Sequence, residues 1–296
     1  MRLIGSVECW RSPARHDRKG CPACARAMKA TTFIALAVGL VMGVATVATA
    51  EFPTFPVRRC AADAVRAGTV CLDRYEASVW RVPDPTSTNR LLVRKIQFGL
   101  ATRADLTAGG ATQLGIAAAD YAPCGKNGQT CADDVYAVSL PSELPSTLLT
   151  WFQAQEACAN SGKRLPTNAE WQVGANGTPD PGPDDGTTDC DTASDGVALT
   201  GTRNRCVSAR GAFDMVGNMA EWVADWVPMP TNCPGWASFG DDEMCLAGAS
   251  TTQNSPGALV RGGAFASLGG SRAGPLAVHV FAPLHTNNFV GFRCAR

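Results

Sequence analysis

The chain has 296 residues, and its 26 Lys and Arg balance 26 Asp and Glu, so the formal net charge is zero. Residues 1–50 hold seven of the basic and two of the acidic side chains, which leaves residues 51–296 with 19 basic and 24 acidic groups. A mildly acidic region with scattered basic residues lacks the positive patch that binds phosphate backbones, so we expect no nucleic-acid partner. Its length predicts a single large domain with a sizeable core over residues 51–296.

The first fifty residues have the layout of a secretory signal peptide. Lys29 precedes an apolar run over residues 31–47, and Ala48-Thr49-Ala50 is a small-x-small cleavage signal. We therefore predict cleavage after Ala50, a secreted or periplasmic protein, and no stable membrane span after cleavage. The alternative is an uncleaved signal anchor that tethers the protein, because residues 31–50 are nearly long enough to cross a bilayer.

A possible second start lies just before this signal, at Met28. Residues 1–27 are then either an N-terminal extension that is not translated or a long charged region of the signal peptide. Under both interpretations they stand outside the domain predicted for residues 51–296.

Cysteine is the strongest compositional signal. Ten of the 13 cysteines lie in residues 51–296, and an even number in an exported chain predicts disulfides rather than a reactive thiol. Eight of the ten form close sequential pairs, each closing a short loop: Cys60/Cys71, Cys124/Cys131, Cys190/Cys206 and Cys233/Cys245. Cys158 and Cys294 are left over.

The middle of the chain predicts two helices followed by a long loop. Residues 148–160 place apolar side chains at helical spacing. Thr167-Asn168-Ala169-Glu170 is a T-x-x-E capping box that opens a second short helix, with Trp171 entering the core, so we interpret Glu170 as a cap and not as a catalytic acid. Residues 176–201 contain six aspartates among Gly, Pro, Ser and Thr. Such irregular connections usually need disulfides or other cross-links to keep their shape.

Four short blocks follow one another across the C-terminal half. They read GKRLPTNAEW (162–171), GAFDMVGNMAEW (211–222), RGGAFA (261–266) and GFRCAR (291–296). Together and in this order they resemble the formylglycine-generating enzyme (sulfatase-modifying factor) family, from about Leu149 to the C-terminus, and residues 71–76 resemble the family's opening strand. The resemblance implies a modified C-type-lectin-like fold of the α+β class with little regular secondary structure. It also implies a bridge between the positions of Cys158 and Cys294, in agreement with the pair left over.

The second block carries a calcium hypothesis. Asp214 and Glu221 flank a Gly-Asn turn, and calcium prefers carboxylate and carbonyl oxygens from a sharply folded loop. The resemblance implies a structural calcium bound by the side chains of Asp214 and Glu221 and the carbonyls of Gly217 and Met219. The alternative is that this segment is only a turn and that Glu221 pairs with an arginine. A second calcium site would fall in the aspartate-rich loop, with Asp191 as a candidate.

The segment after Arg261-Gly262-Gly263 decides the chemistry. In oxygen-dependent members of the family it carries two cysteines, five residues apart, that bind copper(I) and oxidise a substrate cysteine; thiolate suits this soft ion. Counted from the RGG, these positions hold Ser267, a hard neutral alcohol, and Arg272, a permanent cation. The resemblance therefore implies no copper and no copper-dependent oxidation. Ser267 and Arg272 remain as candidate cleft residues whose catalytic role is unknown.

Two other chemistries are alternatives for this cleft. Some relatives use non-haem iron, which takes two histidines and a carboxylate, and residues 51–296 offer only His279 and His285. An iron site would have to use both, so we regard iron as a lesser alternative. No nucleophile-elbow motif surrounds Ser267, which favours a turn serine over acyl transfer.

Three functions remain open from the sequence. The first is an exported family member, without copper-dependent cysteine oxidase activity, that acts on or binds a peptide or small molecule in the family cleft. The second is a non-catalytic lectin-like binding module for protein or glycan, and the third is a non-haem iron oxidoreductase. The fold does not choose among them. A polar cleft with titratable groups would favour an enzyme, whereas an aromatic groove without them would favour binding.

Overall fold

The computed structural model describes residues 59–132, 134–179, 184–236, 240–249, 255–268 and 270–296. The chain divides into two compact units, Met1–Phe55 and Pro56–Arg296, and every described residue belongs to the second. The predicted signal peptide therefore lies outside the described residues. Within the described part, no helix is both long and apolar enough to cross a membrane.

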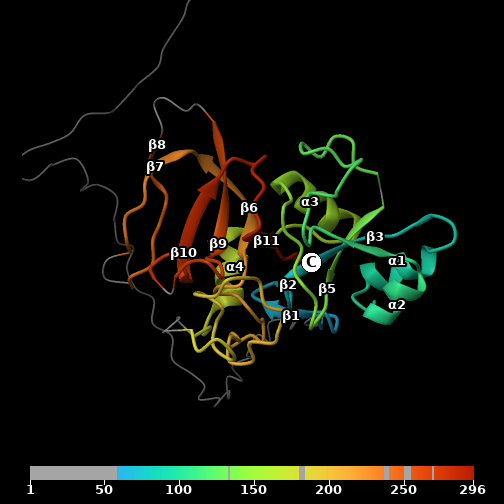
Figure 1. Ribbon diagram of the computed structural model, residues 1–296, viewed down its shortest axis with the longest axis horizontal. Coiled ribbons are helices and arrows are strands. Elements are labelled where there is room, and N and C mark those ends of the chain that lie inside the picture. The colour runs from blue at the N-terminus through green and yellow to red at the C-terminus, as the bar shows by residue number, and fades with distance from the viewer. Residues whose placement is uncertain (1–58, 133, 180–183, 237–239, 250–254, 269) are drawn as a thin grey trace, which may run out of the picture. The chain divides into compact units, whose positions relative to one another are not determined.

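A four-stranded sheet brings three of the sequence blocks side by side (Figure 1). Its strands, in spatial order, are β10 (Gly274–Phe281), β9 (Pro256–Gly262), β6 (Ala220–Pro228) and β11 (Val290–Phe292). β9 pairs antiparallel with β6 and β10, and β11 runs parallel to β6. The register sets Glu221 opposite both Arg261 and Gly291, so blocks that are far apart in the sequence become neighbours.

Three smaller sheets complete the strands. A three-stranded sheet has the order β4 (Thr112–Leu114), β3 (Ala77–Arg81), β5 (Val135–Ser139); β1 (Ala64–Ala67) pairs with β2 (Val70–Asp73), and β7 (Pro230–Asn232) with β8 (Ala247–Ala249). The opening strand expected over residues 71–76 ends early, at Asp73. Beyond it the Arg74 amide donates to the Asp63 carbonyl and the Arg74 carbonyl accepts from Phe213, which turns the chain away from the sheet.

Four short helices are described: α1 (Arg90–Gln97), α2 (Arg103–Ala108), α3 (Trp151–Asn160) and α4 (Asn168–Ala175). α4 begins as predicted, because the Thr167 hydroxyl accepts from the Glu170 amide and the Glu170 carboxylate accepts from the Thr167 amide. α3 begins three residues later than predicted. Leu148 has a φ of 59°, outside the helical region, and Thr150 caps the helix with Gln153 in a second capping box.

The core lies under the main sheet and around α4. Trp171, Trp222 and Phe292 have no exposed surface, as expected for Trp171. The Trp171 indole donates to the Glu221 carboxylate at 2.7 Å, which satisfies its only polar atom inside the core.

Five disulfides staple the loops: Cys60–Cys71, Cys124–Cys131, Cys158–Cys294, Cys190–Cys206 and Cys233–Cys245. These are the pairings that the sequence predicted, and the long bridge joins α3 to the segment after β11. The fold class is confirmed as α+β, with few helices, short strands and disulfide staples.

Candidate functional site

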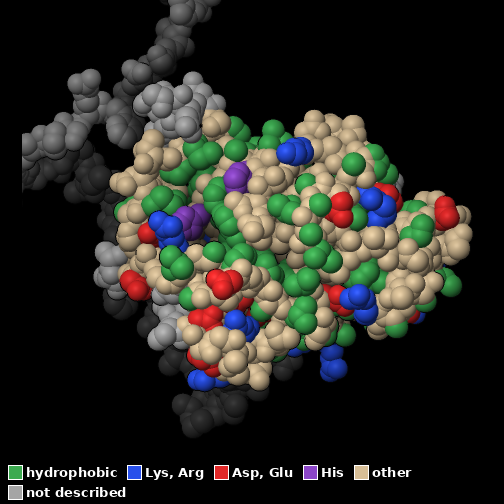
Figure 2. Space-filling view, in the orientation of Figure 1, with side chains coloured by type: hydrophobic (Ala, Val, Ile, Leu, Met, Phe, Trp, Pro, Cys, Tyr) green, Lys and Arg blue, Asp and Glu red, His purple; other side chains and the backbone are tan. Residues whose placement is uncertain are grey.

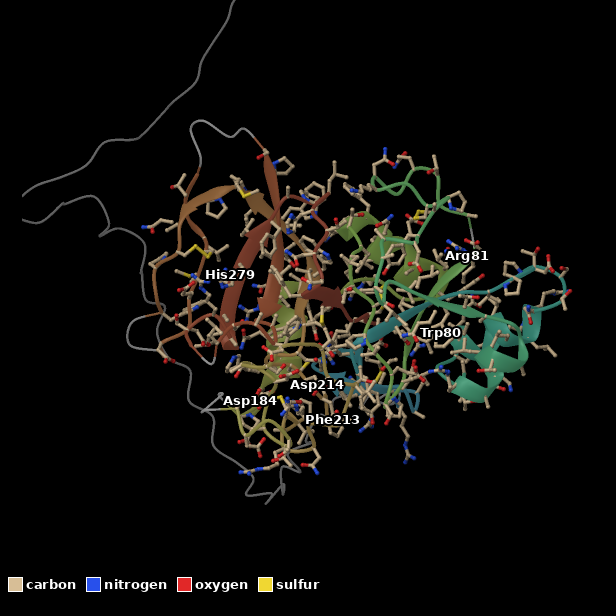
Figure 3. All side chains as sticks on the ribbon, in the orientation of Figure 1. Trp80, Arg81, Asp184, Phe213, Asp214 and His279 are labelled. Atoms are coloured by element: carbon tan, nitrogen blue, oxygen red, sulfur yellow. A yellow bond between two sulfur atoms is a disulfide. The ribbon has the colours of Figure 1, made fainter. Side chains whose placement is uncertain are left out.

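A pocket of about 370 Å³ opens beside β9 and β10. Most of its lining comes from the turn after the RGG, the strand β10 and a stretch between β7 and β8, and Ala220, Val260 and Phe289 complete it. Its polar and sulfur-bearing lining residues are Ser267, Arg272, His279, Glu243, Cys233 and Cys245. In Figure 2 one histidine lies beside a basic side chain at a hollow in this face, and Figure 3 marks His279 on β10.

The RGG block shapes the pocket wall through its backbone. Arg261 is buried, and its guanidinium donates to the carbonyls of Pro275, Leu276 and Ala277, which holds the start of β10. Gly263 has a φ of 77°, and a Cβ there would stand 2.3 Å from the Arg272 carbonyl oxygen. Glycine is therefore required for the turn that carries Ser267 and Arg272 to close on itself.

The two candidate cleft residues are both on the pocket wall, with different surroundings. The Ser267 hydroxyl accepts from the Ala264 amide at 3.0 Å, and the Ser267 amide donates to the Ala264 carbonyl, which is the arrangement of a turn serine. The Arg272 side chain is 71% exposed, with Nε 3.7 Å from Oε2 of Glu243. Ser267 thus closes the turn, while Arg272 presents a positive charge at the rim.

A segment held by isolated β-bridges brings two further groups into the pocket. The Glu243 carbonyl accepts from the Val278 amide at 3.0 Å, and the Cys245 amide donates to the Val278 carbonyl at 2.9 Å. The Asp242 carboxylate accepts from the Leu276 amide at 2.8 Å. These bonds fasten the segment to the edge of β10, so that Glu243 and Cys245 both flank His279.

His279 is the centre of this group. Its Nδ1 lies 3.2 Å from Sγ of Cys245, and its Nε2 lies 3.9 Å from Oε2 of Glu243. Burial lowers the pKa of His279, and the opposing attraction of Glu243 is smaller, so the imidazole is neutral at pH 7. A disulfide sulfur carries no proton, so the Nδ1–H must be the donor to Cys245.

Among the described residues, Glu243, Cys245 and His279 form the one group of three potential metal ligands whose ligand atoms all lie within 4.8 Å. Cys245 is in a disulfide and cannot supply a thiolate in this state. His285 stands apart from the group, with its ring stacked on Phe281 at 4.8 Å between centroids. The described part of the chain therefore does not assemble both histidines with a carboxylate, as a facial iron triad would require.

The predicted calcium loop surrounds a buried arginine. The Arg293 guanidinium donates to both carboxylate oxygens of Glu221, at 2.6 to 2.9 Å, and also to the carbonyls of Phe213 and Asp214. Arg293 and Glu221 have no exposed surface. This is the arginine pairing given above as the alternative to calcium ligation by Glu221. Figure 3 marks Phe213 and Asp214 at a place separate from His279.

Two more carboxylates crowd this buried centre, which we define as Glu76, Asp214, Glu221 and Arg293. Glu76 accepts from the Met219 amide and from the Asn218 side chain. Burial raises the pKa of Glu76 well above its usual range and that of Asp214 to about 7. Three carboxylates share one guanidinium, so the centre has a shortage of positive charge that a cation would relieve.

The fit of the predicted ligands to calcium is partial. Glu221 is occupied by Arg293 and Trp171, and one Asp214 oxygen accepts from the Gly201 amide. Asp191 fits better than its sequence context suggested, because its buried Oδ2 has no hydrogen-bond partner while Oδ1 is bonded to Arg203. Calcium at Asp214, Gly217, Met219 and Glu221 therefore stays a prediction, with Asp191 close to the same turn.

Sequence reasoning missed Glu243 and the part played by the Cys233–Cys245 bridge. Glu243-Met244-Cys245 has the alternation that puts two side chains on one face of an extended segment, which is a weak signal. The sequence offered His279 as a possible iron ligand and cleft residue, without its partners. Nothing local in the sequence indicates that β10 brings His279 against Cys245, 34 residues away.

Comparisons with known proteins identify the family. Residues 106–296 match the profile described as sulfatase-modifying factor enzyme 1-like domain. Among solved structures, the major tropism determinant U1 variant is 16% identical over 79% of this chain and 52% of its own, with a TM-score of 0.41. PvdO from Pseudomonas aeruginosa is 20% identical over 77% of this chain and 80% of its own, also with a TM-score of 0.41. The chain thus spans about half the length of the major tropism determinant.

No curated protein matches the sequence. Because the profile match covers more than half of the residues, the chain belongs to the sulfatase-modifying factor enzyme 1-like family.

Proposed function

We propose that the protein is an exported family member that binds or acts on a peptide or small molecule in the pocket beside β10, without copper-dependent cysteine oxidation. The observation that carries this proposal is the pocket itself, in which Ser267 and Arg272 converge with His279 and Glu243. A concave site with a few converging polar groups is the usual form of a ligand site. The titratable pair His279 and Glu243 favours a chemical role over simple adhesion.

The donor atoms support the exclusion of copper chemistry at the family's cysteine positions. The Ser267 hydroxyl is used in closing its own turn, and the Arg272 guanidinium is a permanent cation that cannot ligate a metal. Arg272 is instead suited to a carboxylate or another anionic group of a ligand, because its side chain is 71% exposed.

The turn that carries Ser267 also presents an exposed apolar side chain. Leu268 is 84% exposed and has a φ of 60°, a backbone conformation that is uncommon for leucine. An exposed apolar side chain held in an unfavourable conformation is typical of a binding loop. We infer that Leu268 and Arg272 contact the same ligand from one turn.

Blocking the pocket tests this proposal. Ala266 lines the pocket and is exposed, so Ala266→Trp fills the space without displacing core atoms. Titration calorimetry with a panel of short peptides, some of them carrying cysteine or free carboxylates, should detect binding to the wild type and its loss in Ala266→Trp. Ala198→Trp is a matched control, because Ala198 does not line the pocket. Equal binding by the wild type and Ala266→Trp would contradict the proposal.

A second candidate is a lectin-like binding module for glycan or protein, and an aromatic cluster favours it. Trp226 is 41% exposed and lies edge-on against Trp151 and Phe152, with ring centroids 5.1 and 5.7 Å away. Such rings bind the apolar faces of sugars or side chains. Oligosaccharide binding that persists in Ala266→Trp and disappears in Trp226→Ala would favour this candidate over the pocket.

The proposal also includes export of the protein and a structural calcium ion. Five disulfides are typical of an extracellular or periplasmic protein, and the signal-like residues 1–50 provide the route. Bound calcium would add positive charge beside Asp214 and Asp191 and so would stabilise the fold, without taking part in the pocket's chemistry. N-terminal sequencing of the secreted protein should begin at Glu51; a chain that retains residues 31–50 would contradict cleavage.

A further inference from the structure

The five disulfides differ in how far they can be reached. Nine of the ten bridged cysteines are buried or partly buried, and Cys233 is the exception, being exposed. Its partner Cys245 is only 5% exposed. This bridge is also the one whose two cysteines both line the pocket of about 370 Å³. Cys233 is therefore the more accessible half of the bridge to an incoming group, and Cys245 is the more shielded half.

The shielded sulfur has a proton donor beside it. His279 Nδ1 lies 3.2 Å from Sγ of Cys245, and because a disulfide sulfur has no hydrogen, the imidazole N–H points at it. Glu243 Oε2 stands 3.9 Å from the other ring nitrogen. A cysteine released from the bridge at this position would be a thiolate that accepts a hydrogen bond from the imidazole N–H, which makes it a better leaving group.

We propose that Cys233–Cys245 is a redox-active disulfide that exchanges with the thiol of a peptide or small molecule in the pocket, with His279 as the catalytic residue at the leaving sulfur. The proposal rests on ligand binding in the pocket, as argued above. It assigns the chemistry to a cysteine pair carried by the stretch from β7 to β8, outside the RGG turn.

The exchange balances in two steps. In the first, the ligand thiolate attacks Sγ of Cys233, a new S–S bond forms, and the Cys233–Cys245 bond breaks. Its electron pair stays on Sγ of Cys245 as a thiolate that accepts a hydrogen bond from His279 Nδ1–H, and this thiolate then takes a proton from solvent. In the second, another ligand thiol attacks the mixed disulfide and releases Cys233. Two ligand thiols become one disulfide, two electrons pass to the protein, and both cysteines end as thiols.

Peptide mapping after a brief reaction with glutathione tests the proposal. The purified wild-type protein is mixed with excess reduced glutathione, quenched in acid, alkylated with N-ethylmaleimide and analysed by mass spectrometry. We expect glutathione on Cys233 and alkylation on Cys245 at times when the other four bridges are intact. Glutathione first on Cys245, or opening of Cys60–Cys71 or Cys124–Cys131 as fast as this bridge, would overturn the proposal.

Two histidine variants test the role of the proton donor. His279→Phe keeps a ring of similar size but has no N–H, and it should slow the appearance of free Cys245 by about tenfold or more, in line with the loss of a hydrogen bond to the charged leaving thiolate. His285→Phe is the matched control and should react like the wild type. Equal rates for the wild type and His279→Phe would overturn the assignment of His279.

The same assay in Ala266→Trp separates this inference from the proposed function. Slower exchange in Ala266→Trp supports a reaction inside the pocket, whereas an unchanged rate contradicts it. The proposed function is measured independently by calorimetry with thiol-free peptides. Peptide binding without selective exchange would leave the proposed function standing and overturn the redox inference alone.

Discussion

The buried centre around Arg293 and the pocket around His279 are both polar clusters, yet they differ in what surrounds them. Arg293 has no exposed surface, and its donors reach Glu221 and the carbonyls of four other residues: Asp73, Arg74, Phe213 and Asp214. His279 and Glu243 face an open pocket with few bonds to the scaffold. The difference indicates that the first cluster stabilises the fold and that the second is accessible to a ligand.

Replacing Arg293 should have the largest effect. Arg293→Met leaves Glu221 buried without its counter-charge, and breaking a buried pair in this way costs about 3–5 kcal/mol. Arg272→Met removes an exposed charge from the pocket rim and should change stability by less than about 0.5 kcal/mol. Urea unfolding of both variants checks the comparison. Similar losses for the two variants would show that the distinction between scaffold and pocket is wrong.

Two of the disulfides differ in the length of the loop that each one closes. Cys158 and Cys294 are 136 residues apart in the sequence, whereas Cys233 and Cys245 are 12 apart. The chain-entropy model therefore predicts that deleting the long bridge costs about 2 kcal/mol more than deleting the short one. Double variants to Ala at each pair, compared by urea unfolding, measure the difference. A greater loss from the Cys233/Cys245 variant would assign that bridge a structural role instead.

The buried centre should make the stability of the protein depend on pH. Burial raises the pKa of Asp214 to about 7, above its value in the unfolded chain, so the folded state binds more protons between about pH 4 and pH 7. Stability should therefore fall as pH rises through this window, by up to about 1.4 kcal/mol per pH unit. The fall should be weaker in Asp214→Asn.

Calcium should reverse this trend, because a bound cation favours the ionised carboxylates. We expect millimolar calcium to raise the melting temperature of the wild type at pH 8 more than at pH 5, and EDTA to abolish the gain. Asp191→Asn and Asp214→Asn should each reduce it. An identical melting temperature with calcium and with EDTA at pH 8 would contradict the calcium prediction.

The parts of the structure that the sequence predicted are local or are fixed by ordered blocks. The T-x-x-E pattern at residues 167–170 specifies its own hydrogen bonds, so the start of α4 was predictable. Cysteines that are close in the sequence, such as Cys190 and Cys206, need only a short loop between them to form a disulfide. The family and fold class followed from four blocks whose order is unusual enough to identify them.

The remainder depends on contacts between distant segments. Glu221 could have met calcium or an arginine, and only the parallel pairing of β11 with β6 places Arg293 against it. His279 was visible as a histidine, but its partners Glu243 and Cys245 reach it through the backbone bonds to Val278. Ser267 and Arg272 both line the pocket, whereas their neighbours there could not be predicted from sequence spacing.

The most direct test of the central claim is incubation of the purified protein with a Cys-x-Pro-x-Arg peptide, copper(I) and oxygen, followed by reduction and mass spectrometry of the peptide. With Ser267 and Arg272 at the family's cysteine positions, we predict that the recovered peptide carries unmodified cysteine and gives no adduct with an aminooxy reagent. Formation of formylglycine, trapped as such an adduct, would contradict the account.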